Sequence, residues 1–169
     1  MQTKKEQLPP LRPEFTSADR LLEMLAILTL AVLWIMAVFA YRSLPETIPT
    51  HFDIKGQIDG HGSRLTLMIS PIMVTLLIPA MLWLSRYPHI FNYMVKITPE
   101  NQLAQYRLAA RFIRGMAIGV GIIFLLILWM MINSAKSGQT HSMAVIIISI
   151  LAISFIPLII YMVISSRLR

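Results

Sequence analysis

The stretch LPETIPTHFDIKGQIDGHGSR, residues 44–64, is the polar segment around which the rest of this chain is organised. It holds three of the eight acidic residues, two of the four histidines and three of the seven glycines. Long apolar runs lie on both sides of it. This pattern predicts a polar loop that apolar helices hold at a membrane surface.

The composition is that of a membrane protein. Of the 169 residues, 56% are hydrophobic and 14% are charged, whereas a soluble globular domain carries about 25% charged residues. The mean hydropathy is +0.68. The net charge of +7 does not indicate nucleic-acid binding, because the basic residues are scattered at the ends of apolar runs. The chain has no cysteine, so no disulfide fastens the polar loop.

Four apolar runs have the roughly 20 residues that cross a bilayer as a helix. The first exceeds the roughly 7–15 apolar residues of a signal peptide, so we expect a retained helix. Pro71, Pro79 and Pro157 predict local kinks. We expect an all-α integral membrane protein with a single four-helix domain at 21–166. Its helices are expected at about 21–41, 65–85, 115–135 and 143–164, with an outer loop at 42–64 and an inner loop at 86–114. A flexible proline-rich tail is expected at 1–20 and a short tail at 167–169.

Two glycines in the third run are spaced for helix packing. Gly115 and Gly119 form a G-x-x-x-G pattern, which places both on one helix face and lets another helix approach closely. The alternative is that they are simply permissive glycines, which are common in membrane helices.

Lysine and arginine counts predict the orientation. The two tails and the inner loop together hold eleven of these residues, and the opposite side holds four. We therefore expect a multi-pass protein of the bacterial cytoplasmic membrane, with both termini cytoplasmic and the outer loop facing outward.

The inner loop carries helix signals of its own. In Thr98-Pro99-Glu100, a capping residue precedes a proline suited to the first turn and an acid suited to the positive helix end. Apolar side chains then recur at helical spacing at Leu103, Tyr106, Ala110 and Ile113. This favours an amphipathic helix lying at the inner membrane surface. A plain cytoplasmic extension of the third helix explains the spacing equally well.

The outer loop carries the signals of a hairpin. Pro45 and Pro49 predict an extended segment. Alternation over 50–54 places Phe52 and Ile54 on one side and His51 and Asp53 on the other. Turns are expected at Gly56 and Gly60, with Asp59 hydrogen-bonding the backbone that follows it.

Four residues of this loop form the pattern H-x-D-x5-D-x-H. Imidazole and carboxylate groups together can bind zinc or another divalent metal. The candidate ligands are His51, Asp53, Asp59 and His61. The alternative is that these residues build the turn and make the surface polar.

Two stretches resemble motifs of one family, the SdpI-like bacterial membrane proteins of unknown function. In the outer loop the matching residues are Pro45, Pro49, His51, Phe52, Gly56, Asp59 and Gly60. FNYMVKITPENQLAQYRLAAR is similar to a second motif, with Lys96, Thr98, Glu100, Asn101, Gln105, Tyr106 and Arg111 in place. The resemblance implies a role in toxin immunity or signalling. It adds two inner residues to the candidate binding residues, which are then His51, Asp53, Asp59, Glu100 and Tyr106.

Two function hypotheses remain. In the first, a non-enzymatic binding, immunity or signalling protein embedded in the lipid bilayer uses its outer loop to recognise a peptide toxin or an envelope protein. A cytoplasmic regulator is a further expected partner, and no cofactor is expected. The uncharged runs at 24–41, 65–85, 115–135 and 143–164 contain no Asp, Glu, Lys, Arg or His, which argues against proton relays, ion-coupled transport and intramembrane proteolysis.

The second hypothesis is an outer-surface metal-dependent enzyme that uses His51, Asp53 and Asp59. The sequence lacks H-E-x-x-H, which argues against a zincin-type site. A serine protease-like site would need Ser63 to converge with His51 and Asp53, and nothing in the spacing brings them together. We therefore favour a protein that is not an enzyme.

Overall fold

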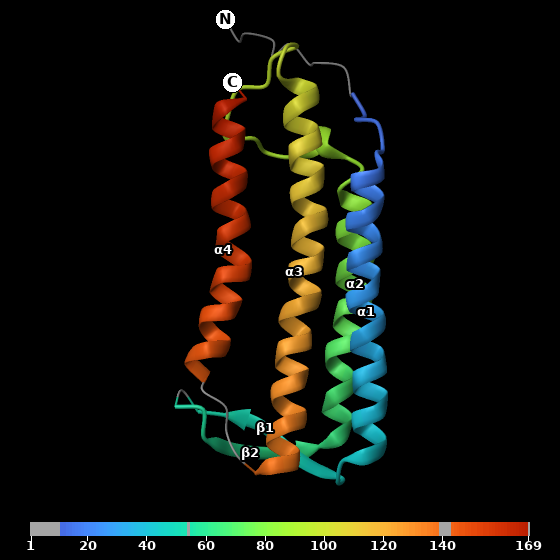
Figure 1. Cartoon of the computed structure of the whole chain (residues 1–169), viewed down its shortest axis with the longest axis vertical. Coiled ribbons are helices and arrows are strands. Elements are labelled where there is room, and N and C mark those ends of the chain that lie inside the picture. The colour runs from blue at the N-terminus through green and yellow to red at the C-terminus, as the bar shows by residue number, and fades with distance from the viewer. Residues whose placement is uncertain (1–10, 54, 139–142, 169) are drawn as a thin grey trace, which may run out of the picture.

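The computed structural model describes residues 11–53, 55–138 and 143–168. Four long helices stand side by side, and a two-stranded hairpin covers one end of the bundle (Figure 1). The start of the first helix and the end of the last helix lie at the other end. Lys4, Lys5 and Arg169, which belong to the lysine and arginine count of the two tails, lie outside the described residues, as does Ile54 of the expected strand alternation.

The four helices are α1 (Ser17–Ser43), α2 (Ile69–Leu84), α3 (Gln102–Ser137) and α4 (Met143–Arg167). Each is part of a helical segment that is long and apolar enough to cross a membrane. This confirms the predicted class of four-helix membrane protein. Neither Pro79 nor Pro157 ends its helix: α2 continues through Pro79, and α4 continues through Pro157.

Helix α1 begins at Ser17, before the expected residue 21, and a capping box fixes its start. The Thr16 hydroxyl accepts a hydrogen bond from the Asp19 backbone N–H, and the Asp19 carboxylate accepts one from the Thr16 backbone N–H. These two bonds satisfy backbone groups that a helix start leaves open. Part of the expected tail is therefore helix.

Helix α3 runs unbroken from Gln102 to Ser137. Of the two alternatives for the inner loop, the structure therefore shows the extension of the third helix. Thr98 does not cap α3, contrary to the sequence prediction. Asn101 precedes the helix, and its side chain accepts from the Thr98 backbone N–H and donates to the Lys96 carbonyl.

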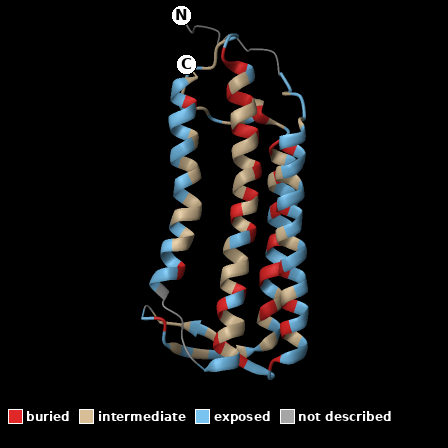
Figure 2. Ribbon diagram, in the orientation of Figure 1, coloured by how far each residue is buried: buried red, intermediate tan, exposed pale blue. Residues whose placement is uncertain are grey.

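The apolar core joins α1, α2 and α3 and continues into the hairpin. Its fully buried members include Leu33 of α1, Ile78 of α2, Leu128 of α3 and Ile48 of the first strand. Helix α4 packs mainly on α3 and leaves much of its apolar surface exposed (Figure 2). In a membrane protein such a surface is the one that meets lipid.

The close helix contacts occur at glycines, but only partly at the expected ones. A Cβ on Gly121 would overlap Thr29 of α1, with 2.6 Å to the Thr29 Cβ. A Cβ on Gly119 would lie 3.1 Å from Ile153 Cγ2 of α4, whereas one on Gly115 would meet nothing within 4 Å. The close approach predicted for Gly115 and Gly119 is confirmed at Gly119 alone, and the tightest contact is at Gly121.

A buried polar contact joins α3 to the end of α4. The Gln105 side chain is fully buried and donates to the Ser165 carbonyl at 2.8 Å. The Ser165 hydroxyl donates back to the Gln105 side-chain oxygen, also at 2.8 Å. Because the last carbonyls of a helix lack partners within the helix, this contact both caps and positions α4.

Candidate functional site

The outer loop is a hairpin, as predicted. Strand β1 (Thr47–Phe52) pairs antiparallel with β2 (Ile58–Ser63). Arg64, directly after β2, ties the hairpin to the end of α1: its side chain donates to the Leu44 carbonyl at 2.9 Å and its backbone N–H to the Glu46 carbonyl at 2.8 Å. The Arg64 guanidinium also lies over the Tyr41 ring, 4.8 Å from its centroid. The base of the hairpin is therefore firmly anchored.

The turn of the hairpin is held by Asp53, and the turn role predicted for Asp59 is wrong. The Asp53 carboxylate accepts a hydrogen bond from the Gln57 backbone N–H at 2.7 Å, and its own N–H donates to the Gln57 carbonyl. Gly56 supplies the left-handed conformation of this turn, with φ of 84°. Asp53 is therefore bound to the backbone that closes the turn.

His51 and Asp59 form a pair across the two strands. The distance from His51 Nδ1 to Asp59 Oδ1 is 2.5 Å, and the side chains are 73% and 45% exposed. The strand register is irregular at His51, which lies opposite Gly60. A Cβ on Gly60 would be 2.8 Å from the His51 Cβ, so glycine is needed for this approach.

The pair sets the hydrogen-bonding state of the imidazole. Because a carboxylate can only accept, His51 Nδ1 carries the hydrogen that Asp59 receives. The other ring nitrogen, Nε2, is then the atom that His51 can offer to a partner. The site is an exposed, oriented imidazole on an anchored hairpin.

The four predicted metal ligands are not brought together as a set. Among the residues that the structure describes, no group of three or more His, Asp or Glu side chains is arranged to hold a metal ion. His51 and Asp59 are neighbours, but Asp53 is occupied at the turn. Ser63, which a serine protease-like site would need, is also engaged elsewhere, because its hydroxyl accepts a hydrogen bond from the Leu65 backbone N–H.

The two inner candidates lie in different surroundings. Tyr106 is buried, and its ring stacks on Tyr93 with 5.5 Å between centroids. The Tyr93 hydroxyl donates to the Pro88 carbonyl, and burial raises the pKa of Tyr93. Glu100 is exposed, and a hydrogen bond from the Thr98 side chain lowers the pKa of its carboxyl. Tyr106 therefore contributes packing within the bundle end, whereas Glu100 can reach solvent.

An ion-pair cluster with a buried centre, which the sequence analysis missed, lies at the end of the bundle opposite the hairpin. Asp19 Oδ1 lies 3.1 Å from Arg111 Nε and 3.4 Å from Arg114 Nη1. The Glu23 carboxylate oxygens lie 3.2 Å from Arg114 Nε and 3.6 Å from Arg86 Nη2. The side chains of Asp19 and Arg114 are only 4% and 6% exposed.

A sequence signal for this cluster existed. Asp19 and Glu23 are four residues apart and share one face of α1, and Arg111 and Arg114 are three apart on α3. Read separately, Asp19 belonged to the expected tail at 1–20, Glu23 to the start of the expected helix at 21–41, and the two arginines to the polar positions of the inner-loop helix. Only the packing of α1 against α3 joins them.

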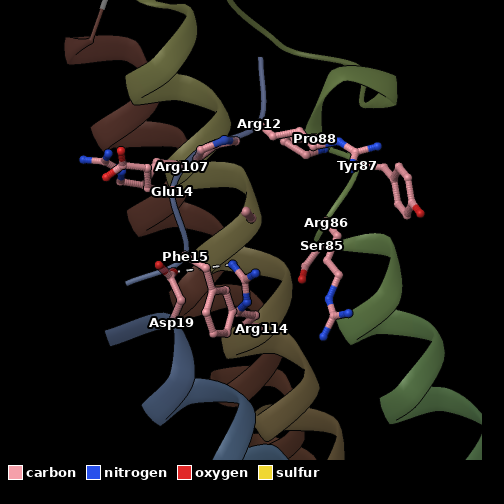
Figure 3. Close-up of a pocket in the computed structure, with 12 residues that line it drawn as sticks. Arg12, Glu14, Phe15, Asp19, Ser85, Arg86, Tyr87, Pro88, Arg107 and Arg114 are labelled. Carbon is pink, nitrogen blue, oxygen red and sulfur yellow. Dashed lines mark hydrogen bonds and ion pairs between the residues drawn. The ribbon is translucent and has the colours of Figure 1, made fainter. Parts of the chain in front are cut away.

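A pocket of about 460 Å³ lies beside this cluster (Figure 3). The segment before α1, the residues after α2 and the first half of α3 all contribute to it. The residues that line it are Arg12, Pro13, Glu14, Phe15, Asp19, Ser85, Arg86, Tyr87, Pro88, Arg107, Ala110 and Arg114.

Comparison with known proteins places the hairpin in the region that matches a family model. Residues 28–75 match the domain of unknown function DUF1648, a range that runs from α1 through the hairpin into α2. The chain is also 34% identical over 86 residues to an uncharacterized protein of Archaeoglobus fulgidus. That match covers 46% of this chain and 46% of the archaeal protein, so the chain spans about half the length of this relative. No solved structure matches the chain.

Proposed function

We propose that this protein is a non-enzymatic binding protein of the cytoplasmic membrane, which recognises a peptide or an envelope protein through its hairpin. The observation that carries the proposal is the His51–Asp59 pair, 2.5 Å apart and largely exposed on a strand pair whose base is anchored. An oriented imidazole presented to solvent can donate to, or accept from, a partner without first being ordered.

Three features favour binding over catalysis. Ser63 and Asp53 are engaged elsewhere, and they form no nucleophile–base arrangement with His51. The pair stands on an exposed surface, where a reaction would not be shielded from water. The resemblance to the SdpI-like family, whose outer motif includes these residues, favours immunity or signalling within this class. A cytoplasmic regulator remains a further proposed partner.

The orientation is part of the proposal. The hairpin lies opposite the bundle end that carries the ion-pair cluster (Figure 1). A cysteine replacing Gln57, which is exposed near the turn, should react with a membrane-impermeant reagent in intact cells. If the Gln57→Cys protein is labelled only after the membrane is opened, the hairpin faces the cytoplasm and the proposed orientation is wrong.

The binding function can be tested by crosslinking at the hairpin. A photoreactive amino acid at Lys55, which is exposed beside the turn, should give one dominant adduct in cells. His51→Asn keeps an amide N–H near the Nδ1 position, whereas His51→Gln places an amide near the Nε2 position. If Nε2 makes the contact, the Asn variant should lose the adduct and the Gln variant should retain part of it. An adduct unchanged in both variants and in Asp59→Ala would refute a binding role for this pair.

A further inference from the structure

The pocket at the bundle end opposite the hairpin has an excess of positive charge. Within the described residues, five arginines and three carboxylates gather in the pocket and the adjoining ion-pair cluster: Arg12, Arg86, Arg107, Arg111, Arg114, Glu14, Asp19 and Glu23. Two positive charges are therefore left without a counter-charge. In a partly enclosed space such an excess attracts anions more strongly than it would on an open surface.

Two of these arginines are not engaged by the carboxylates of the cluster. Arg107 Nε is buried and has no hydrogen-bond partner among the residues that the structure describes. Arg12 is exposed, and its guanidinium lies over the Tyr87 ring, 5.7 Å from the centroid. A buried guanidinium N–H without an acceptor costs free energy, which an anion in the pocket would recover.

The ion-pair cluster keeps the remaining charges in place. Asp19 and Glu23 hold Arg114 from two sides, and the Phe15 ring lies 5.3 Å from its guanidinium. Figure 3 shows Arg114 directed at Asp19 beside the pocket. Arg114, which lines the pocket, is thus held in place before any ligand arrives, and its charge adds to the positive potential that Arg12 and Arg107 present.

The other walls are apolar. Pro13, Phe15, Pro88 and Ala110 line the same space. The pocket therefore combines guanidinium groups, which match phosphate in charge and geometry, with a surface suited to the carbon atoms attached to that phosphate.

We propose that this pocket binds a phosphate group, carried either by an anionic lipid headgroup of the adjacent leaflet or by a soluble phosphate ester. Both sources present phosphate oxygens to Arg12 and Arg107, on a group that carries one or two negative charges. The proposal is independent of the hairpin function, because the two sites lie at opposite ends of the bundle (Figure 1).

The test uses the full chain in an uncharged detergent and in nanodiscs. In detergent, sodium phosphate and glycerol phosphate are each compared with sodium chloride at equal ionic strength. In nanodiscs, phosphatidylcholine alone is compared with phosphatidylcholine containing phosphatidic acid. The thermal unfolding midpoint is the readout, since a ligand that binds only the folded state raises it.

The matched variants are Arg107→Gln and Arg12→Gln, with Arg20→Gln as the control. Arg20 is exposed near the same end of the bundle and does not line the pocket. The pocket variants should weaken the phosphate affinity by about tenfold to a hundredfold, and the control should not.

The detergent and nanodisc experiments together distinguish the two sources of the phosphate group. Stabilisation by soluble phosphates identifies a soluble ester, and stabilisation by phosphatidic acid alone identifies a lipid headgroup. The proposal is overturned if neither arm raises the midpoint, or if Arg20→Gln loses as much affinity as Arg107→Gln.

Discussion

Each end of the bundle holds a pair formed by a basic side chain and an aspartate, and the two pairs differ mainly in how far their side chains are exposed to solvent. At the hairpin end, His51 and Asp59 are 73% and 45% exposed. At the opposite end of the bundle, Arg114 and Asp19 are 6% and 4% exposed. Exposed pairs contribute little to stability, whereas breaking a buried pair leaves a charge without compensation. The comparison indicates that the buried pair holds the fold and that the exposed pair is free to serve a partner.

The largest effect is expected from breaking the buried pair. Asp19→Ala should lower the free energy of unfolding by about 3–5 kcal/mol, because Arg111 and Arg114 lose a shared carboxylate and α1 loses its capping box. The measurement is chemical unfolding in detergent. The control is Glu14→Ala, an exposed acid at the same end. If both variants lose the same stability, the burial of Asp19 is not what makes it important to the fold.

The middle of the bundle can show whether close packing matters as much as charge. Gly121→Ala should cost about 1–3 kcal/mol, because the added Cβ overlaps Thr29 of the neighbouring helix. Gly115→Ala is the matched control on the same helix, and it should leave stability unchanged or slightly higher. Equal unfolding midpoints for the two variants in detergent would contradict the contact between α1 and α3.

A change behind the exposed pair should affect its geometry more than the fold. Gly60→Ala should push His51 away from Asp59 and cost about 1 kcal/mol, since an exposed hairpin can relax. Nitrogen-15 spectra of the His51 ring should report the loss of the Nδ1 hydrogen bond, and the crosslink at Lys55 should weaken. An unchanged ring spectrum would mean that the strands tolerate a side chain at residue 60.

The smallest effect is expected from the exposed pair itself. In a double-mutant cycle with His51→Ala and Asp59→Ala, the coupling energy should be about 0.2–1 kcal/mol. Binding to the hairpin partner should nevertheless be lost in the His51→Ala protein. A coupling energy as large as that of Asp19 with Arg114 would remove the distinction between the two ends.

The candidate site was predicted in part. The hairpin, its turn at Gly56 and the extended backbone at Pro49 follow from signals within a few residues. The turn predicted at Gly60 is wrong, because Gly60 lies within β2 and pairs with His51. The partners of the two aspartates were assigned wrongly, because the strand irregularity at His51 brings Asp59 to the imidazole and leaves the turn to Asp53. A simple alternation of side chains could not reveal that irregularity.

By itself, the sequence determined the membrane class, the approximate positions of the four apolar helices and the presence of a polar hairpin. These depend on bilayer thickness, hydropathy and turn chemistry, all of which act over short stretches of chain. Only the tertiary structure decided that Glu23 meets Arg114 across 91 residues and that Gly121, more than Gly115, admits another helix. Those outcomes depend on which faces of α1 and α3 pack together, and that choice is made by the whole bundle at once.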